Sequence, residues 1–146
     1  MMGKHIACSI QGYEMNDTIN TIKLSYGRAL GNREMFDIFY QKFTQGRPSI
    51  ARQFRNIDMA HQKEMLKQSL SMAILFPQNN VVANRSMGKI KLSHGSEGMA
   101  IKPSDYRIWL DSLIDTLKVC DPYFNADLEK MWREVLGKTI NYLTSK

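Results

Sequence analysis

The sequence predicts an all-α fold, and two observations carry this prediction. Apolar residues recur every three or four positions along most of the 146 residues, which is the spacing of one face of an α-helix. Glycine and proline fall between the periodic segments, as at Gly31, Gly46-Arg47-Pro48 and Pro77, where they end helices. A chain of this length, with 43% apolar and 23% charged residues, is expected to fold as one globular domain.

The first predicted helix covers residues 16–30 and ends at Gly31. The residues before it show no comparable periodicity and look unstructured. We therefore expect residues 1–14 to form an N-terminal extension and residues 15–146 to form the domain. The helical spacing rests on Ile19, Ile22 and Tyr26.

Two further helices are expected before residue 55. Asn32 is a suitable N-cap for a helix over residues 33–45, because its side chain can accept a hydrogen bond from a free backbone N–H. Pro48 suits the first turn of a short helix ending near Phe54, where its missing N–H is not needed. The apolar face of the longer helix consists of Met35, Phe36, Phe39, Tyr40 and Phe43.

The next helix is predicted over residues 59–75, with Asp58 as its N-cap. The residues 77–80, Pro-Gln-Asn-Asn, stop it. Its expected inward face mixes apolar and polar side chains, namely Gln62, Met65, Leu66, Ser69, Leu70, Ala73 and Ile74.

A short helix is expected over residues 86–94, followed by a corner over residues 95–102 that carries two glycines. Ile90 and His94 are four residues apart and so share one face of this helix. A helix of about nine residues is marginal in water, so packing or a ligand must hold it.

Two long, regular helices close the chain, over residues 103–120 and about 125–143, with Asp121-Pro122 between them. We expect these helices to form the packing platform of the domain. Trp109 and Trp132 are expected to be core residues that join them.

Composition narrows the classes of partner. Lys and Arg exceed Asp and Glu by 20 − 14 = 6, but no dense basic run or aromatic-basic interleaving indicates nucleic-acid binding. No apolar run approaches the roughly 18 residues of a membrane span, and residues 1–5 do not resemble a signal peptide. Cys8 and Cys120 are too few for a disulfide framework and fit a reducing compartment. We therefore expect a cytoplasmic protein with neither a nucleic-acid nor a membrane partner.

His94 is the first candidate functional residue, and its position fits two roles. One is a positive charge at a helix C-terminus, where the macrodipole stabilises it. The other is a neutral imidazole ligand to haem iron, which needs an acceptor for the second ring nitrogen. The carbonyl of Ile90 and the hydroxyl of Ser93 are the acceptors within reach along the helix.

Gln62 and Tyr40 also have two interpretations each. Gln62 is either a solvated residue of a first helical turn or an amide donor facing a pocket. Tyr40 is either a core tyrosine bonded to a carbonyl or a hydroxyl donor to a bound ligand. No Gly-rich phosphate loop, His/Cys cluster or Ser-His-Asp set is present, so no catalytic residue is expected.

In order and spacing these residues resemble the globin family, most closely its bacterial single-domain, flavohaemoglobin-like and sensor-type branches. Tyr40 stands eight residues before Pro48, and Phe54 stands six after it, as in the second globin helix and the corner that follows. Gln62 matches the distal ligand-gating position, and His94 matches the proximal iron-ligand position. The resemblance extends over about residues 17–143, including Ile101, Pro103, Tyr106 and Trp109 after the corner.

The resemblance implies a three-over-three helical sandwich around non-covalent haem b, iron–protoporphyrin IX. His94 would be the proximal iron ligand, and Tyr40 and Gln62 would donate to bound dioxygen. The other haem contacts that it implies are Phe54, Leu66, Ile90, Ile101 and Tyr106.

The function implied is reversible oxygen binding with slow release, with nitric oxide and carbon monoxide as further ligands. Two alternatives stay open: nitric-oxide dioxygenation with a separate reductase, and ligand-responsive gas sensing through a signalling partner. The glutamate that polarises the proximal histidine of flavohaemoglobins would fall just beyond Lys146. The protein is expected to be a monomer or a homodimer, and Arg55, Lys89 and Lys91 are the guesses for partners of the haem propionates.

Overall fold

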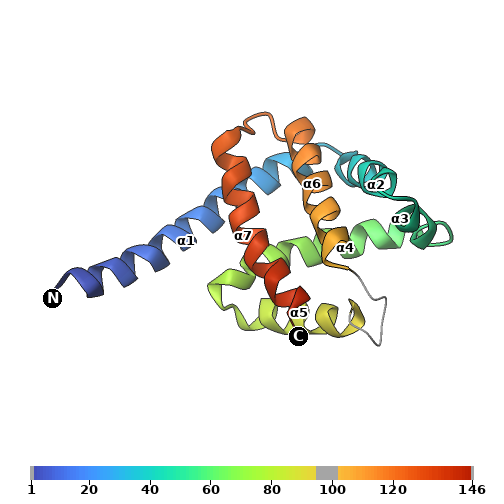
Figure 1. Cartoon of the computed structure of the whole chain (residues 1–146). Coiled ribbons are helices and arrows are strands. Elements are labelled where there is room, and N and C mark those ends of the chain that lie inside the picture. The colour runs from blue at the N-terminus through green and yellow to red at the C-terminus, as the bar shows by residue number, and fades with distance from the viewer. Residues whose placement is uncertain (1, 95–101, 146) are drawn as a thin grey trace.

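The computed structural model describes residues 2–94 and 102–145, which fold into the helices labelled in Figure 1. The first four α-helices are α1 (Met2–Leu30), α2 (Met35–Gln45), α3 (Pro48–Gln53) and α4 (Met59–Leu75). A 3-10 turn, η1 (Phe76–Gln78), leads into α5 (Val81–His94), α6 (Pro103–Cys120) and α7 (Ala126–Thr144). These residues contain no strand, which confirms the all-α prediction.

The helices pack in two crossed layers of three, with α1, α4 and α5 in one and α2, α6 and α7 in the other. Helix α2 packs on α6, α1 packs on α7, and α4 forms a hairpin with α5. In Figure 1, α6 and α7 run side by side in front of α1 and α4. This is the expected three-over-three arrangement.

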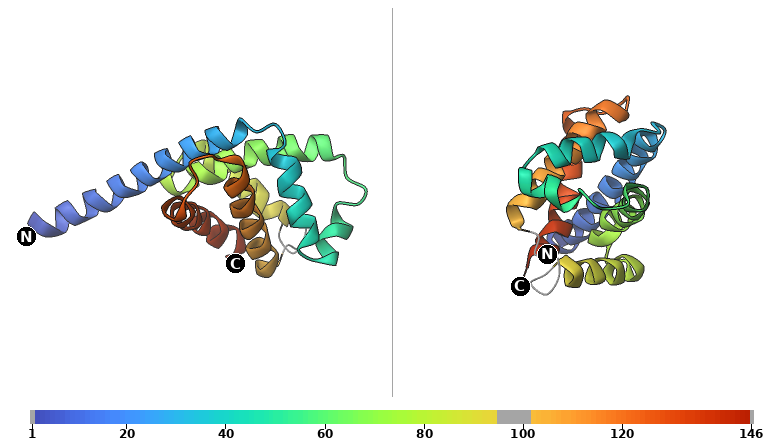
Figure 2. Two further views of the ribbon diagram at one scale, coloured as in Figure 1. Left: turned by 90° about the horizontal axis from the view of Figure 1, so that it is seen from above. Right: turned by 90° about the vertical axis from the view of Figure 1, so that its right-hand side faces the viewer.

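Helix α1 begins at Met2, so the prediction of an unstructured N-terminus was wrong. No proline lies within residues 2–30 to interrupt the α-helical hydrogen bonds that the packed part nucleates. The first turns of α1 project away from the other helices in Figure 1 and in the left-hand view of Figure 2. The domain boundary after residue 14 stays a prediction.

The N-terminus of α4 agrees with the prediction, and that of α5 does not. The Asp58 carboxylate accepts the N–H groups of Ala60 and His61 at 3.1 and 3.3 Å, as predicted for an N-cap. Helix α5 starts at Val81, five residues before the predicted start at 86, because the Asn80 side chain accepts the Ala83 N–H at 3.0 Å. Asn80 therefore opens α5 as well as ending the preceding segment.

The N-cap of α2 also differs from the prediction. Glu34 holds the N-cap position, and its side chain makes no capping hydrogen bond. Asn32 instead accepts the Glu34 N–H at 2.9 Å within the preceding turn. Asn32 therefore shapes the turn between α1 and α2 and does not cap the helix.

Each tryptophan makes a specific contact with a helix outside the α6–α7 pair. Trp132 of α7 is fully buried, and its indole N–H donates to the Ser25 hydroxyl of α1 at 3.0 Å. Trp109 of α6 packs edge-on against Phe39 of α2, with ring centroids 5.9 Å apart. Trp132 joins the two layers of the sandwich, and Trp109 joins α6 to α2. Both contacts go beyond the predicted link between α6 and α7.

A buried carboxylate fastens α1 to the turn between α6 and α7. Asp121 accepts Arg28 Nε at 2.7 Å, Ser25 Oγ at 2.7 Å and the Tyr123 N–H at 3.0 Å. Burial raises the pKa of the Asp121 carboxyl, but the hydrogen bonds from Arg28, Ser25 and the Tyr123 backbone more than offset it. The pKa is therefore held below its ordinary value.

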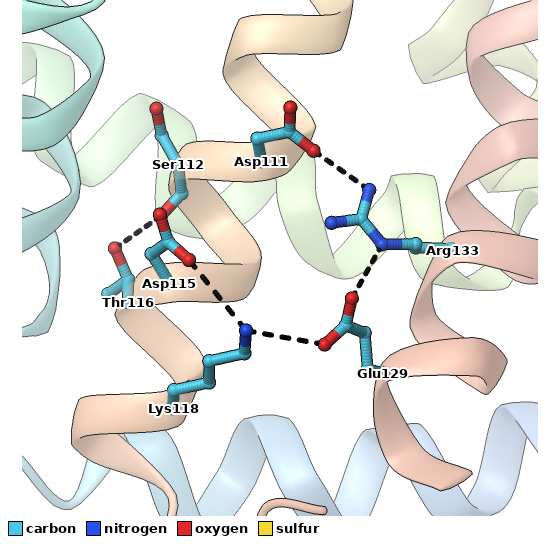
Figure 3. Close-up of polar contacts among 7 residues, drawn as sticks. All are labelled: Asp111, Ser112, Asp115, Thr116, Lys118, Glu129 and Arg133. Carbon is cyan, nitrogen blue, oxygen red and sulfur yellow. Dashed lines mark hydrogen bonds and ion pairs between the residues drawn. The ribbon is translucent and has the colours of Figure 1, made fainter. Parts of the chain in front are cut away.

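The solvent side of α6 and α7 is polar. Figure 3 shows Arg133 between Asp111 and Glu129, at 2.9 and 3.0 Å, and Lys118 between Glu129 and Asp115, at 3.4 and 4.0 Å. Exposed pairs of this kind add little stability, and they neutralise each other's charge. Among the described residues, no helix combines the length and the hydropathy that crossing a lipid bilayer requires.

The Asp121 network predicts a specific acid sensitivity. Because the pKa of Asp121 is lower in the folded chain, the contribution is fully present above the unfolded value, near 3.8, and is lost as the pH falls through the native value. Asp121→Asn should lower the free energy of unfolding at pH 7 by about 2 kcal/mol and flatten its decline in acid. Urea unfolding from pH 7 to about 2 measures both effects, with Asp115→Asn at an exposed site as the control. Equal acid sensitivity in the wild type and Asp121→Asn would contradict the assignment.

The close approach of α2 to α6 gives a second prediction. A Cβ at Gly46, at the end of α2, would overlap the Ile108 side chain of α6, whereas a Cβ at Gly137 of α7 would enter open space. We expect Gly46→Ala to destabilise the protein by about 1–3 kcal/mol through overpacking. Gly137→Ala should be neutral or stabilising by up to about 1 kcal/mol through helix propensity. Thermal unfolding of both variants checks the pair, and a stabilised Gly46→Ala protein would show that α2 and α6 are not held this closely.

Candidate functional site

A cavity of about 230 Å³ is enclosed by α4 and α5 and is completed by side chains from α2, α3, α6 and α7. A water molecule occupies only about 30 Å³ in the liquid, so the cavity is large enough for a sizeable ligand. Its wall is mostly apolar, as is usual for cofactor sites. The apolar lining includes Phe43, Ile50, Phe54, Leu66, Met87, Ile90, Trp109, Leu136 and Leu143.

Six of the expected haem contacts and distal residues meet at this cavity together with His94. Tyr40 and Phe54 come from the α2–α3 region, and Gln62 and Leu66 come from α4. Ile90 comes from α5 and Tyr106 from α6. Ile101 lies outside the described residues, so its expected contact is not described. The fold therefore gathers residues that are up to 66 positions apart, from Tyr40 to Tyr106, around one space.

His94 is the last residue of α5, and its Nδ1 lies 2.8 Å from the Tyr106 hydroxyl oxygen. The predicted partners were wrong, because the Ser93 hydroxyl donates to the Ile90 carbonyl at 3.0 Å and the two satisfy each other. The true partner is 12 residues further along the chain, on the first turns of α6. Only the inward helical phase of Tyr106, one turn before Leu110, signalled it in the sequence.

Burial keeps both members of this pair neutral. It lowers the pKa of the half-buried His94 imidazole and raises the pKa of the Tyr106 hydroxyl to about 12. The Tyr106 oxygen can donate or accept, so it accommodates either imidazole tautomer. When Nδ1 carries the proton and donates it to Tyr106, the lone pair of Nε2 is available to a metal. A neutral imidazole oriented through its second nitrogen is the form that iron binds.

Tyr40 and Gln62 form the second polar group of the cavity. The Gln62 amide Nε2 donates to the Tyr40 hydroxyl oxygen at 3.2 Å. The Tyr40 hydroxyl hydrogen and the second amide hydrogen of Gln62 are not used by this bond. Burial raises the pKa of Tyr40 to about 12, against the smaller opposing effect of the Gln62 hydrogen bond. Tyr40 therefore remains a neutral donor at physiological pH.

Aromatic packing holds Tyr40 in place. Its ring lies 5.4 Å from the ring of Phe54 and 5.1 Å from that of Phe39, measured between centroids. Contacts of this geometry add about 0.5–1.5 kcal/mol beyond simple burial. The hydroxyl is thus presented by a side chain with little freedom to move.

Sequence reasoning missed two further polar residues of the lining. Thr139 of α7 donates to the Ala73 carbonyl at 2.7 Å and fixes α7 to α4. Asp105 pairs with Arg47 at 3.0 Å, where the α2–α3 junction meets the start of α6. Thr139 lies one turn after Val135 on the apolar stripe of α7, which was the signal that it faces inward.

The guessed partners of the haem propionates do not line the cavity. Arg55, Lys89 and Lys91 are absent from its wall. Lys91 donates to the Ser145 hydroxyl at 2.7 Å, and its Nζ lies 4.7 Å from the centre of the Tyr142 ring. Contacts with the C-terminal end of α7 therefore hold this side chain in place.

The donor set fits haem. Among the side chains that the structure describes, no three His, Cys, Asp or Glu residues converge into a cluster that would hold a bare metal ion. Haem needs no such cluster, because the porphyrin supplies four nitrogens and a single protein imidazole completes the proximal side. His94, with Nδ1 engaged by Tyr106 and an apolar cavity beside it, meets that requirement.

Comparison with known proteins agrees with this geometry. No family model matches the chain, and no curated protein shows significant sequence similarity to it. Among solved structures, a Pseudomonas aeruginosa protein matches with a TM-score of 0.82 and 26% identity, over 86% of this chain and 95% of that chain. That protein is described as structurally highly homologous to a human haemoglobin. With this likeness, the chain has a globin-like fold.

Proposed function

We propose that this globin-like protein holds haem b in the cavity between α4 and α5 and binds dioxygen reversibly, with nitric oxide and carbon monoxide as further ligands. The observation that carries the proposal is a neutral imidazole and a pair of neutral donors facing one apolar cavity. Haem supplies the ferrous iron to which the gas binds. The chain would supply the imidazole that holds the iron, the hydrogen-bond donors and the exclusion of water.

In this proposal His94 would hold the haem iron through Nε2, and Tyr106 is the positioning residue of that imidazole. The 2.8 Å hydrogen bond fixes the rotation of the imidazole about its Cβ–Cγ bond, so that the Nε2 lone pair has one direction. Tyr106 is a neutral acceptor with a raised pKa, so it draws less of the Nδ1 proton than a carboxylate does. The imidazole is therefore less electron-rich than the proximal histidine of a dioxygenase. This difference favours reversible gas binding over the dioxygenase reaction.

Tyr40 and Gln62 set the affinity for the gas. Tyr40 and Gln62 would donate hydrogen bonds to dioxygen held at haem, whereas carbon monoxide is a poorer acceptor and would gain less. A neutral donor contributes about 1 kcal/mol, and each 1.36 kcal/mol is a tenfold change. The pair therefore slows oxygen release by tens- to a hundredfold relative to an apolar pocket. Slow release suits chemistry or sensing better than delivery.

Haem titration followed by absorption tests the proposal. The wild type should bind one haem with a sharp Soret band, and its ferrous form should respond reversibly to oxygen and carbon monoxide. His94→Ala should lose the proximal ligand and with it most of the affinity for haem. His61→Ala, an exposed histidine one residue from Gln62, is the control and should behave as the wild type. Identical spectra and affinities for the two variants would rule out His94 as the ligand.

The distal pair predicts a kinetic difference between two matched tyrosine variants. Tyr40→Phe removes the hydroxyl from the cavity and should speed oxygen release about tenfold, as expected for the loss of one donor. The rate for carbon monoxide should change much less. Tyr26→Phe removes a buried hydroxyl that donates to the Lys67 carbonyl at 3.0 Å, outside the cavity, and should leave oxygen release unchanged. Stopped flow measures the rate of oxygen release. An unchanged rate in Tyr40→Phe would contradict the role of Tyr40 as a hydrogen-bond donor to oxygen.

A further inference from the structure

The outward surface of α5 combines exposed apolar and basic side chains. Val81, Val82 and Leu92 are 70%, 64% and 79% exposed, which places three of the seven exposed large hydrophobic residues of the described chain on this helix. Arg85 and Lys89 are exposed between them. We call these five residues the α5 face. Helix α5 runs along the lower edge of the molecule in Figure 1, and the right-hand view of Figure 2 places it there too.

Among the residues that the structure describes, no carboxylate neutralises the positive charge of the α5 face. The sequence has no acidic residue between Glu64 and Glu97. Within residues 14–94 and 102–145, neither Arg85 nor Lys89 has a carboxylate within ion-pairing distance. On the α6–α7 surface, by contrast, each basic group in Figure 3 lies between acidic partners. Uncompensated charge with exposed apolar residues is typical of a binding surface for an anionic partner.

We propose that the α5 face docks an acidic electron-carrier protein. This proposal rests on the proposed function, because its purpose is to return oxidised haem iron to the ferrous state. One electron leaves the reduced flavin or iron–sulfur centre of the carrier and converts ferric to ferrous iron, with no atom transferred.

The position of α5 suits this partner. Its inner face lines the cavity through Met87, Ile90 and His94. A protein seated on the outer face is thus separated from the cavity by one helix, about 10 Å across. The 14 residues of α5 span about 21 Å, so a contact centred on this helix is small. Interfaces below about 1,200 Å² are typical of transient electron-transfer complexes.

A lipid surface fits the α5 face less well. Helices that lie in a membrane interface present a continuous apolar stripe, with the basic residues on the other side. Here Val81 and Leu92 stand at opposite ends of the helix, and Arg85 and Lys89 lie between them on the same side. Inserting the apolar ends would carry both charges into the acyl region.

The test uses an acidic flavodoxin and an acidic ferredoxin as probes, with binding measured by isothermal titration at low ionic strength. The wild type should bind at least one probe, and added salt should weaken the binding. Arg85→Glu/Lys89→Glu should weaken it at least tenfold, and Leu92→Asn should weaken it severalfold. Lys23→Glu/Lys130→Glu changes the net charge equally, from +6 to +6 − 4 = +2, on α1 and α7, and should have little effect. Circular dichroism verifies that each variant is folded.

Three outcomes would overturn the docking proposal: no binding of either probe, equal weakening by the two charge-reversal pairs, or preferential binding to phosphatidylserine vesicles that is lost in Arg85→Glu/Lys89→Glu. Probe binding is measured with and without haem. The docking proposal and the proposed function can therefore fail separately. A failed haem titration with intact probe binding would overturn the proposed function alone. A normal Soret band without probe binding would overturn the docking surface alone.

Discussion

The hydrogen bond between His94 Nδ1 and the Tyr106 hydroxyl oxygen is the contact on which the site depends. It joins the last residue of α5 to the first turns of α6, and so ties together two walls of the cavity. It also leaves one imidazole nitrogen for a ligand, while burial keeps the ring neutral. Without it, His94 would be a helix-terminal side chain with several rotamers and no defined direction.

The cavity stays open because the stability of the fold comes from contacts around it. The Asp121 network fastens α1 to the α6–α7 turn. Trp132 joins α7 to α1 through its hydrogen bond to Ser25. Tyr26, outside the cavity, and Thr139, in its wall, each donate to a carbonyl of α4 and so fix that helix in place. The apolar residues that line the cavity therefore do not fill it, and the proposed haem would complete their burial.

Patterns within short stretches of sequence predicted the helices. The features that these patterns did not predict depend on contacts between helices. Apolar periodicity and the Asp58 cap placed α4 correctly, since both act within one turn. The start of α5 was missed because Asn80 ends one element and caps the next. The family spacing brought Tyr40, Gln62 and His94 to one cavity, but the bond between His94 and Tyr106 spans two helices, and no local pattern encodes it. The sequence shows the basic residues of the α5 face, but only the structure shows that they are exposed.

A crystal structure of the protein with haem added tests the central claim most directly. The account predicts iron bound by Nε2 of His94, with Nδ1 still within hydrogen-bond distance of the Tyr106 hydroxyl and Tyr40 on the opposite side of the ring. Iron held by Tyr40 or by a histidine other than His94, or haem seated outside the cavity between α4 and α5, would contradict it.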